Sequence, residues 1–225
     1  MSRPAIALMA AAALFIPSAA GAQMLGRDVP HAGTFEVSAG VQSTGSYDFG
    51  SSLADETRNP TTGPDPLTLF QGDSSFGRGN GFFARVGIFL RPRIEVEGGV
   101  QATRPSLIVR TSGDFESAPD TTIESPLTEY VVDGSLLYHF GRGAFVPFAF
   151  GGGGYLRQVL EDASIVETGS EFHGGAGVKY WFGHARRLGI RAEGRASSRS
   201  GGVSLDGSSK RRFAPTFSAG AAYLF

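Results

Sequence analysis

The sequence contains no cysteine, so neither a disulfide framework nor a thiolate metal site is available to this chain. No run of eighteen consecutive apolar residues follows the N-terminal segment, which excludes a transmembrane helix there. Neither sign of charge is in large excess, with 20 Lys and Arg against 21 Asp and Glu. A chain without a basic field is not expected to bind nucleic acid. Backbone hydrogen bonds and packing must therefore hold the fold.

The N-terminal segment "MSRPAIALMAAAALFIPSAAGAQ" has one Arg near its start, a short apolar stretch and small residues before Gln23. This order is typical of a secretory signal peptide and its cleavage site. We expect residues 1–22 to be the signal peptide and residues 23–225 to form a single exported domain. A membrane anchor is disfavoured because the run is short and rich in small residues.

The rest of the chain is unusually rich in glycine and phenylalanine, with 33 Gly and 18 Phe. Segments of about ten residues alternate apolar and polar side chains, the period-2 pattern of a β-strand. The final segment shows it clearly: Phe217, Ala219, Ala221, Tyr223 and Phe225 share one parity. The predicted strands are 33–44, 81–90, 93–103, 128–140, 145–158, 171–182, 188–197 and the terminal run 214–225.

The connections between these strands alternate between long and short. Long polar segments follow the first, third, fifth and seventh strands, and tight turns follow the second, fourth and sixth. An up-and-down antiparallel barrel with short periplasmic turns and long outer loops has this rhythm. Strands of about ten residues also match a tilted crossing of a bilayer. We therefore predict an all-β fold, an eight-stranded antiparallel up-and-down transmembrane β-barrel, in preference to a soluble sandwich.

Strand parity then separates the residues of the two faces. The face of Phe225 is assigned to lipid, and the opposite face is assigned to the barrel interior. The predicted interior ionic network comprises Glu36, Arg85, Glu95, Glu97, Asp133, His139, Lys179, Arg191, Glu193 and Arg195. Because an eight-stranded barrel is filled by its own side chains, these charges are expected to neutralise one another in pairs, with Arg85 near Glu97.

The predicted lipid-facing set carries no charge, as a lipid-facing surface requires. Its members are Phe35, Val37, Phe82, Val86, Ile88, Val96, Val100, Val132, Leu136, Phe148, Phe150, Val178, Ile190 and Phe217. The glycines of "GGGG" (151–154), with Gly174, Gly175 and Gly177, are expected to relieve crowding in a narrow sheet. Small side chains there also leave room for a lateral pocket.

The signal peptide, the eight strands, the alternating loops and the ending "AAYLF" together resemble the small outer-membrane barrels of the OmpA, OmpX and OmpW type. That resemblance implies location in the outer membrane of a diderm bacterium, in contact with its lipid. It also implies that the barrel assembly machinery recognises Tyr223 and Phe225. The sequence has no segment resembling a C-terminal peptidoglycan-binding domain, so a wall-tethering role is not expected.

Enzymatic and metal-binding functions find little support in the motifs. The four histidines occur as "HAG", "HFG", "HGG" and "HAR", without ligand spacing and without the His-x-Ser order of barrel deacylases. "QGDSSFG" (71–77) lies in a polar segment without a strand-to-helix turn. No catalytic residue, cofactor or metal is therefore predicted.

The leading hypothesis is a non-enzymatic barrel with a structural or surface-interaction role. Its expected contact surface is the long segment 45–79, which carries Tyr47, Phe49, Leu67, Leu69 and Phe70. The alternative is a narrow passive channel for ions or small apolar molecules. The sequence names no extracellular partner.

Overall fold

The computed structural model describes residues 30–56, 67–160, 165–202 and 211–225. The predicted signal peptide lies outside the described residues. The strands are β1 (Phe35–Thr44), β2 (Tyr47–Glu56), β3 (Leu67–Phe76), β4 (Gly79–Arg91), β5 (Ile94–Arg104), β6 (Ser106–Ser112), β7 (Thr121–His139), β8 (Phe145–Leu160), β9 (Ile165–Trp181), β10 (Leu188–Gly201) and β11 (Arg212–Leu224). In the described part of the chain, no helix is long and apolar enough to cross a membrane.

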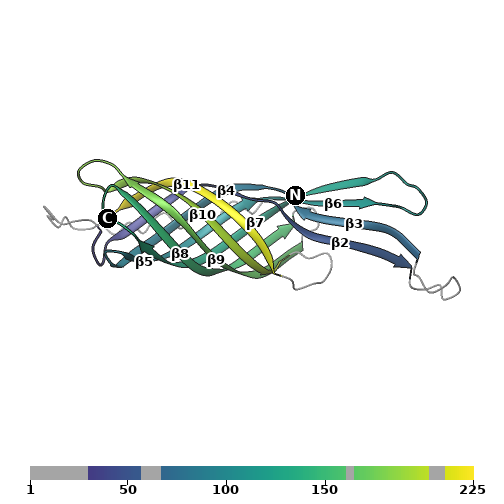
Figure 1. Ribbon diagram of the computed structural model, residues 1–225, viewed down its shortest axis with the longest axis horizontal. Coiled ribbons are helices and arrows are strands. Elements are labelled where there is room, and N and C mark those ends of the chain that lie inside the picture. Colours follow the sequence, from purple (N-terminus) through teal and green to yellow (C-terminus); the bar gives the residue numbers. More distant parts are fainter. Residues whose placement is uncertain (1–29, 57–66, 161–164, 203–210) are drawn as a thin grey trace, which may run out of the picture.

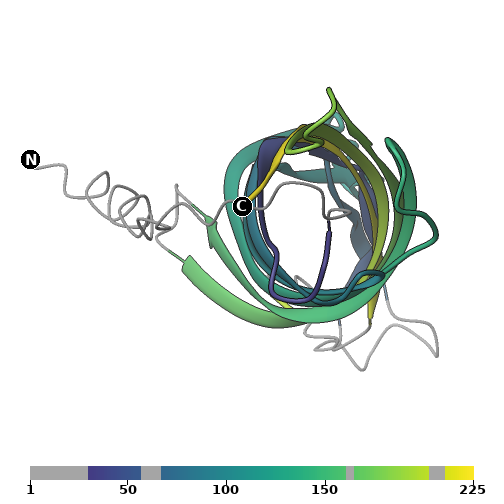
Figure 2. The same ribbon diagram turned by 90° about the vertical axis from the view of Figure 1, so that its left-hand side faces the viewer.

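Eight of these strands close into a barrel. The ring runs β1, β4, β5, β7, β8, β9, β10 and β11, and β11 pairs with β1 to complete it. Every neighbouring pair is antiparallel, and the ring is closed when viewed along its axis (Figure 2). The predicted eight-stranded antiparallel barrel is confirmed. Closure leaves no strand edge in the ring without a hydrogen-bonding partner.

The three remaining strands form an extension beyond the ring. β2 and β3 make one hairpin, β6 pairs with the first part of β7, and β3 pairs with β6, so that four strands share one sheet. Figure 1 shows both hairpins on the side opposite the C-terminus. The expectation of a polar loop over segment 45–79 is wrong for its described residues, because most of them lie in β2 and β3. Its backbone groups pair between hairpins even though its side chains are mostly polar, because hydrogen bonding does not require apolar residues.

Three of the expected loops are shorter than predicted, because backbone hydrogen bonds between neighbouring strands continue into polar sequence. β7 starts at Thr121, β8 reaches Leu160, β9 starts at Ile165 and β10 continues to Gly201. The tight turns are at the other end, between β4 and β5, β7 and β8, and β9 and β10. The last of these contains Gly183 and Arg186 at positive φ, which allows the chain to reverse within six residues.

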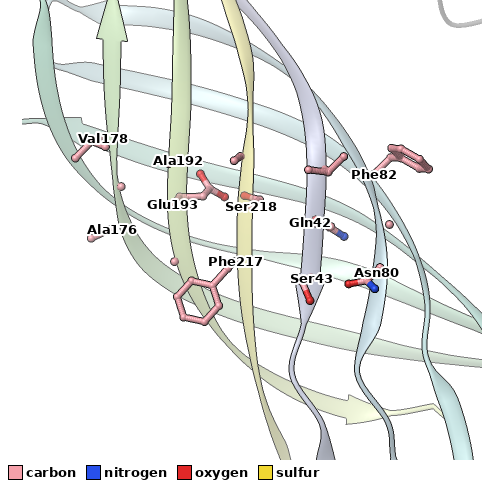
Figure 3. A pocket seen from close by; sticks show the side chains of 15 residues that line it. Gln42, Ser43, Asn80, Phe82, Ala176, Val178, Ala192, Glu193, Phe217 and Ser218 are labelled. Carbon is pink, nitrogen blue, oxygen red and sulfur yellow. The ribbon is translucent and has the colours of Figure 1, made fainter.

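The outer wall is apolar, as the lipid-facing prediction required. Exposed outward side chains include Phe82 and Phe217, each 70% exposed, together with Val86, Val132 and Leu136. A shallow groove of about 860 Å³ crosses this wall over β9, β10, β11, β1 and β4. Phe217 and Phe82 project on different sides of the groove, and small side chains such as Ala192 line it (Figure 3). The lining is mainly apolar, and Glu193 is its charged member.

Candidate functional site

The interior of the barrel gathers the charged side chains of the strands. All ten residues of the predicted ionic network are buried, none more than 8% exposed: Glu36, Arg85, Glu95, Glu97, Asp133, His139, Lys179, Arg191, Glu193 and Arg195. Alternation along each strand places them there, since successive side chains point to opposite faces. Their mutual contacts define what the interior can do.

Lys179 on β9 lies at the centre of a first cluster, near the short-turn end. Its Nζ donates to Glu36 Oε2 at 2.7 Å and to Glu95 Oε2 at 2.9 Å. His139 Nε2 lies 2.9 Å from the same oxygen of Glu95. Strands β1, β5, β7 and β9 thus meet across the interior through one ammonium group. The Lys179 charge is compensated by two carboxylates, as a buried charge requires.

Arg191 on β10 holds the adjoining cluster. Its Nη1 pairs with Glu97, and its Nη2 donates to Glu193 Oε2 at 2.7 Å. Arg85 Nη1 lies 3.6 Å from Glu97 Oε1 and 2.5 Å from Glu193 Oε1. Lys179 and Arg191 are directly paired across β9 and β10, yet the acids between them separate the two positive charges. Each carboxylate of this cluster therefore lies next to at least one cation, and each cation lies next to a carboxylate.

The structure corrects the assignment of Phe148 and Phe150 to the lipid. Both point inward, 1% and 8% exposed. The Arg191 guanidinium lies 4.9 Å from the Phe148 ring centre, and that of Arg195 lies 5.6 Å from the Phe150 ring centre. Such cation–π contacts gain strength where water is excluded. The two rings therefore belong to the ionic network.

The glycines of β9 are what make room for these rings. A Cβ on Gly175 would come within 2.6 Å of Phe150 Cζ, and a Cβ on Gly177 within 2.6 Å of Phe148 Cζ. Of the lateral pocket expected around Gly151, Gly153, Gly175 and Gly177, the space on the inner side of Gly175 and Gly177 is taken by the phenylalanine rings. Gly177 also lines the groove of the outer wall. Gly175 and Gly177 thus serve packing inside the barrel.

A second ionic cluster, near the long-loop end, was only partly foreseen. Arg199 Nη1 lies 2.9 Å from Glu129 Oε1, and its Nε lies 2.9 Å from Glu171 Oε2. Arg195 Nη1 lies 2.5 Å from Asp133 Oδ2 and 3.5 Å from Glu171 Oε1. Glu129 and Arg199 share the parity of Asp133 and Arg195. Arg199 was missed because it lies beyond the predicted end of its strand. Glu129 and Glu171 lie within predicted strands, and their parity could have placed them in the predicted network.

Ser135, Gly152 and His173 form a row across β7, β8 and β9. Ser135 pairs with Gly152, and Gly152 pairs with His173. Because Gly152 has no side chain, the imidazole reaches over it, and His173 Nε2 lies 2.7 Å from Ser135 Oγ. His173 Nδ1 faces Glu171 Oε1 at 3.5 Å. The "GGGG" segment thus lets side chains of the flanking strands meet, a role that its sequence alone did not reveal.

Two groups of side chains have the composition of a metal site: Asp133 with Glu171 and His173, and Glu36 with Glu95 and Glu97. In the first group Arg195 contacts both carboxylates, and in the second Lys179 and Arg191 contact all three. The protein's own cations occupy the position that a metal ion would take.

Within the described residues the interior holds seven acids, five Lys and Arg, and two histidines that face acids.

Apolar layers lie at both ends of the interior. Near the short turns, Phe89, Val146, Trp181, Ala222 and Leu224 pack together from four strands. Near the extension, the buried residues Phe76, Leu107 and Leu127 pack together, with Val109 and Leu160 against them. Along strands such as β7 and β8, the ionic clusters therefore lie between these two apolar layers.

The C-terminal residues of the predicted assembly signal lie on the outer surface. Tyr223 is 37% and Phe225 58% exposed, and their rings make an edge-to-face contact at 4.8 Å. The Phe225 amide donates to the Phe35 carbonyl at 2.9 Å, which ties the chain end to β1. Recognition by the assembly machinery stays a prediction.

Comparison with known proteins gives a family. A family model described as "Outer membrane protein beta-barrel domain" matches residues 6–225. No curated protein matches the chain.

Several solved structures are similar to this chain at low sequence identity. The outer membrane protein OprG from Pseudomonas aeruginosa has a TM-score of 0.58 and 10% identity, covering 87% of this chain and 97% of its own. Neisserial surface protein A has a TM-score of 0.49 and 16% identity, covering 86% and 99%. Ail, the attachment invasion locus protein of Yersinia pestis, has a TM-score of 0.45 and 16% identity, covering 86% and 99%. The likeness to OprG supports the overall fold and nothing beyond it.

Proposed function

Because the chain belongs to the outer membrane protein β-barrel domain family, we propose that it is a non-enzymatic barrel that anchors a surface-interaction module. The protein is located in the outer membrane. Short turns mark the periplasmic end of such barrels and long connections the outer end. The four-stranded extension of β2, β3, β6 and β7 is then the part displayed outside the cell.

The observation that carries this proposal is the filled interior. Two ionic clusters lie between two apolar layers, and their side chains are almost all paired across the barrel. An eight-stranded barrel has an interior only wide enough for its own side chains. A filled interior favours an anchoring role over the alternative, a narrow channel for ions or small apolar molecules.

The extension supports the interaction role because it exposes apolar side chains. Leu53, Leu69, Phe70, Phe115 and Ile123 are all exposed on it. The side chains of the other predicted contact residues, Tyr47, Phe49 and Leu67, lie outside the described part of the structure. Exposed apolar side chains on a polar sheet are typical of contact surfaces. Adhesion of cells displaying the chain is expected to fall when Phe115 and Ile123 are both changed to Ser, and unchanged adhesion contradicts the interaction role.

The row of Ser135, His173 and Glu171 has the residue types of a nucleophilic triad, but its surroundings favour a structural role. Ser135 and His173 are 6% and 7% exposed, and both apolar layers separate them from the ends of the barrel. A nucleophile needs space about 3 Å away for the reacting atom. The filled interior leaves that space to neighbouring side chains, which is why we propose no enzymatic activity.

Single-channel recording in planar bilayers tests the anchoring role. The refolded protein is first shown to be folded by its heat-modifiable migration on a gel. We expect no steps, or rare small ones, for the wild type, for Arg85→Ala and for Glu97→Ala. Steady openings that change with Arg85→Ala or Glu97→Ala, but not with the surface control Arg110→Ala, would establish the channel and overturn the proposal.

A further inference from the structure

The short-turn end of the barrel carries a concentrated positive charge that the anchoring role does not use. Five arginines are exposed on its three turns: Arg91, Arg93, Arg142, Arg186 and Arg187. Exposed His184 lies beside them. In the described part of the chain, this end presents no exposed Asp or Glu side chain, and none of the five arginines forms an ion pair. We call these five residues the arginine rim.

The turns that carry the rim are fixed to the barrel. Backbone hydrogen bonds join the His139 amide to the Arg93 carbonyl and the Leu224 amide to the Arg187 carbonyl, both at 2.8 Å. Arg186 Nη1 donates to the Arg142 carbonyl at 3.3 Å, linking two neighbouring turns. The guanidinium groups therefore project from short, anchored turns that follow one another around the ring.

Aromatic pairs place the rim at the edge of the membrane. Three strands end at this side with exposed rings two residues apart, in edge-to-face contact at 4.8–5.3 Å: Tyr138 with Phe140, Tyr180 with Phe182, and Tyr223 with Phe225. Girdles of aromatic residues lie at membrane interfaces, where the ring is apolar and the tyrosine hydroxyl meets water. Arg142 comes two residues after Phe140, and Arg186 and Arg187 come four and five residues after Phe182. Because the β4–β5 turn with Arg91 and Arg93 is at the same end of the barrel, the arginine rim then lies at the depth of the lipid headgroups.

The opposite end has a different charge pattern. Exposed acids there are Glu116, Asp120, Glu124 and Glu167, with Asp114 half-buried, and they are interspersed with exposed arginines such as Arg104, Arg110 and Arg157. Arg110 and Asp120 even form an exposed ion pair at 2.9 Å. A mixture of signs has no net attraction for an anion, so among the residues that the structure describes the positive charge is concentrated at the short-turn end.

We propose that the arginine rim binds the phosphate groups of anionic phospholipids in the periplasmic leaflet of the outer membrane. A guanidinium group forms paired hydrogen bonds with phosphate oxygens and keeps its charge at any physiological pH. Basic residues at a membrane surface attract anionic lipid, and clusters of them strengthen this binding. Lipid contact at one end would hold the barrel at a fixed depth and orientation while its extension faces outward.

Native mass spectrometry of the full, refolded chain tests the proposal. The protein in detergent is offered equal amounts of phosphatidylglycerol and phosphatidylcholine with the same acyl chains. The rim variant carries Gln at Arg93, Arg142, Arg186 and Arg187. We expect wild type to retain phosphatidylglycerol preferentially and the preference to fall about fivefold for each arginine removed.

The matched control carries Gln at four exposed arginines of the opposite end, Arg78, Arg104, Arg110 and Arg157. It is expected to keep the wild-type preference, and heat-modifiable migration confirms that both variants fold. Absence of a preference in the wild type, or an equal loss in the control, overturns the proposal. Cosedimentation with isolated peptidoglycan that depends on the rim, without a lipid preference, would assign the rim to the cell wall and overturn it as well.

Discussion

Arg191→Met is the change that most directly tests whether the barrel interior is dry. Arg191 is 1% exposed, pairs with Glu97 and with Glu193 at 2.7 Å, and lies 3.8 Å from Glu36. Methionine keeps much of the volume and removes the charge, so that Glu97 is left with Arg85 at 3.6 Å. Removing one partner of a buried pair costs about 3–5 kcal/mol, because the remaining charge stays desolvated and uncompensated.

The free energy of unfolding is measured by urea titration of the refolded protein in phospholipid vesicles. Trp181, the only tryptophan of the chain, lies buried near the short turns and reports the transition by fluorescence. The control is Arg110→Gln, which breaks an ion pair whose side chains are 58% and 50% exposed. Surface pairs contribute about 0–1 kcal/mol. The double variant with Glu97→Gln is expected to recover part of the loss.

The reasoning is refuted if Arg191→Met costs no more than Arg110→Gln. A small effect would mean that water screens the interior charges, and a wet interior would favour the channel over the anchor. Partial recovery of the free energy of unfolding in the double variant would show that loss of the ion pair contributes to the cost. Loss of packing against Phe148 would remain in the double variant, because removing the opposing charge does not restore it.

Three further predictions follow from the packing and the chain end. Gly152→Ala places a Cβ 2.8 Å from His173 Nε2 and against the backbone of a neighbouring strand, and it should destabilise the fold by about 1–3 kcal/mol. Gly151→Ala, whose Cβ meets its nearest atom at 3.8 Å, should be tolerated. The temperature of heat-modifiable unfolding measures both variants. Phe89→Ala removes a ring from the layer near the short turns and is expected to cost about 3–5 kcal/mol in the urea titration. Joint replacement of Tyr223 and Phe225 by Ala is expected to lower the amount of assembled barrel in cells while the refolded variant keeps near wild-type stability; equal losses in both measurements would argue against an assembly signal.

The sequence by itself determined the barrel and most of its interior. Alternation along the strands is set by the backbone, because successive side chains of a strand must point to opposite faces. Placing the charges of strands such as β5 and β10 toward lipid would be prohibitive, so Glu95, Glu97, Arg191 and Glu193 could be assigned inward from their parity alone. The rhythm of long and short connections then gave the number of strands in the ring and their direction.

The sequence did not determine the inward face of β8. In "FVPFAF" both parities are apolar, so no charge marks the interior side. Phe148 and Phe150 point inward because Gly175 and Gly177, on the next strand, leave volume for their rings and because Arg191 and Arg195 lie over them. Both reasons involve residues that are distant in sequence.

The extension and the second ionic cluster were also decided by tertiary structure. Polar segments such as β2 and β3 have no hydrophobic alternation, and they become strands because each finds a partner for its backbone groups. Arg199 on β10 contacts Glu129 and Glu171 across the barrel, and such contacts depend on the stagger of the closed sheet. Periodicity fixes which way a side chain points, but only closure of the ring decides which side chain it meets.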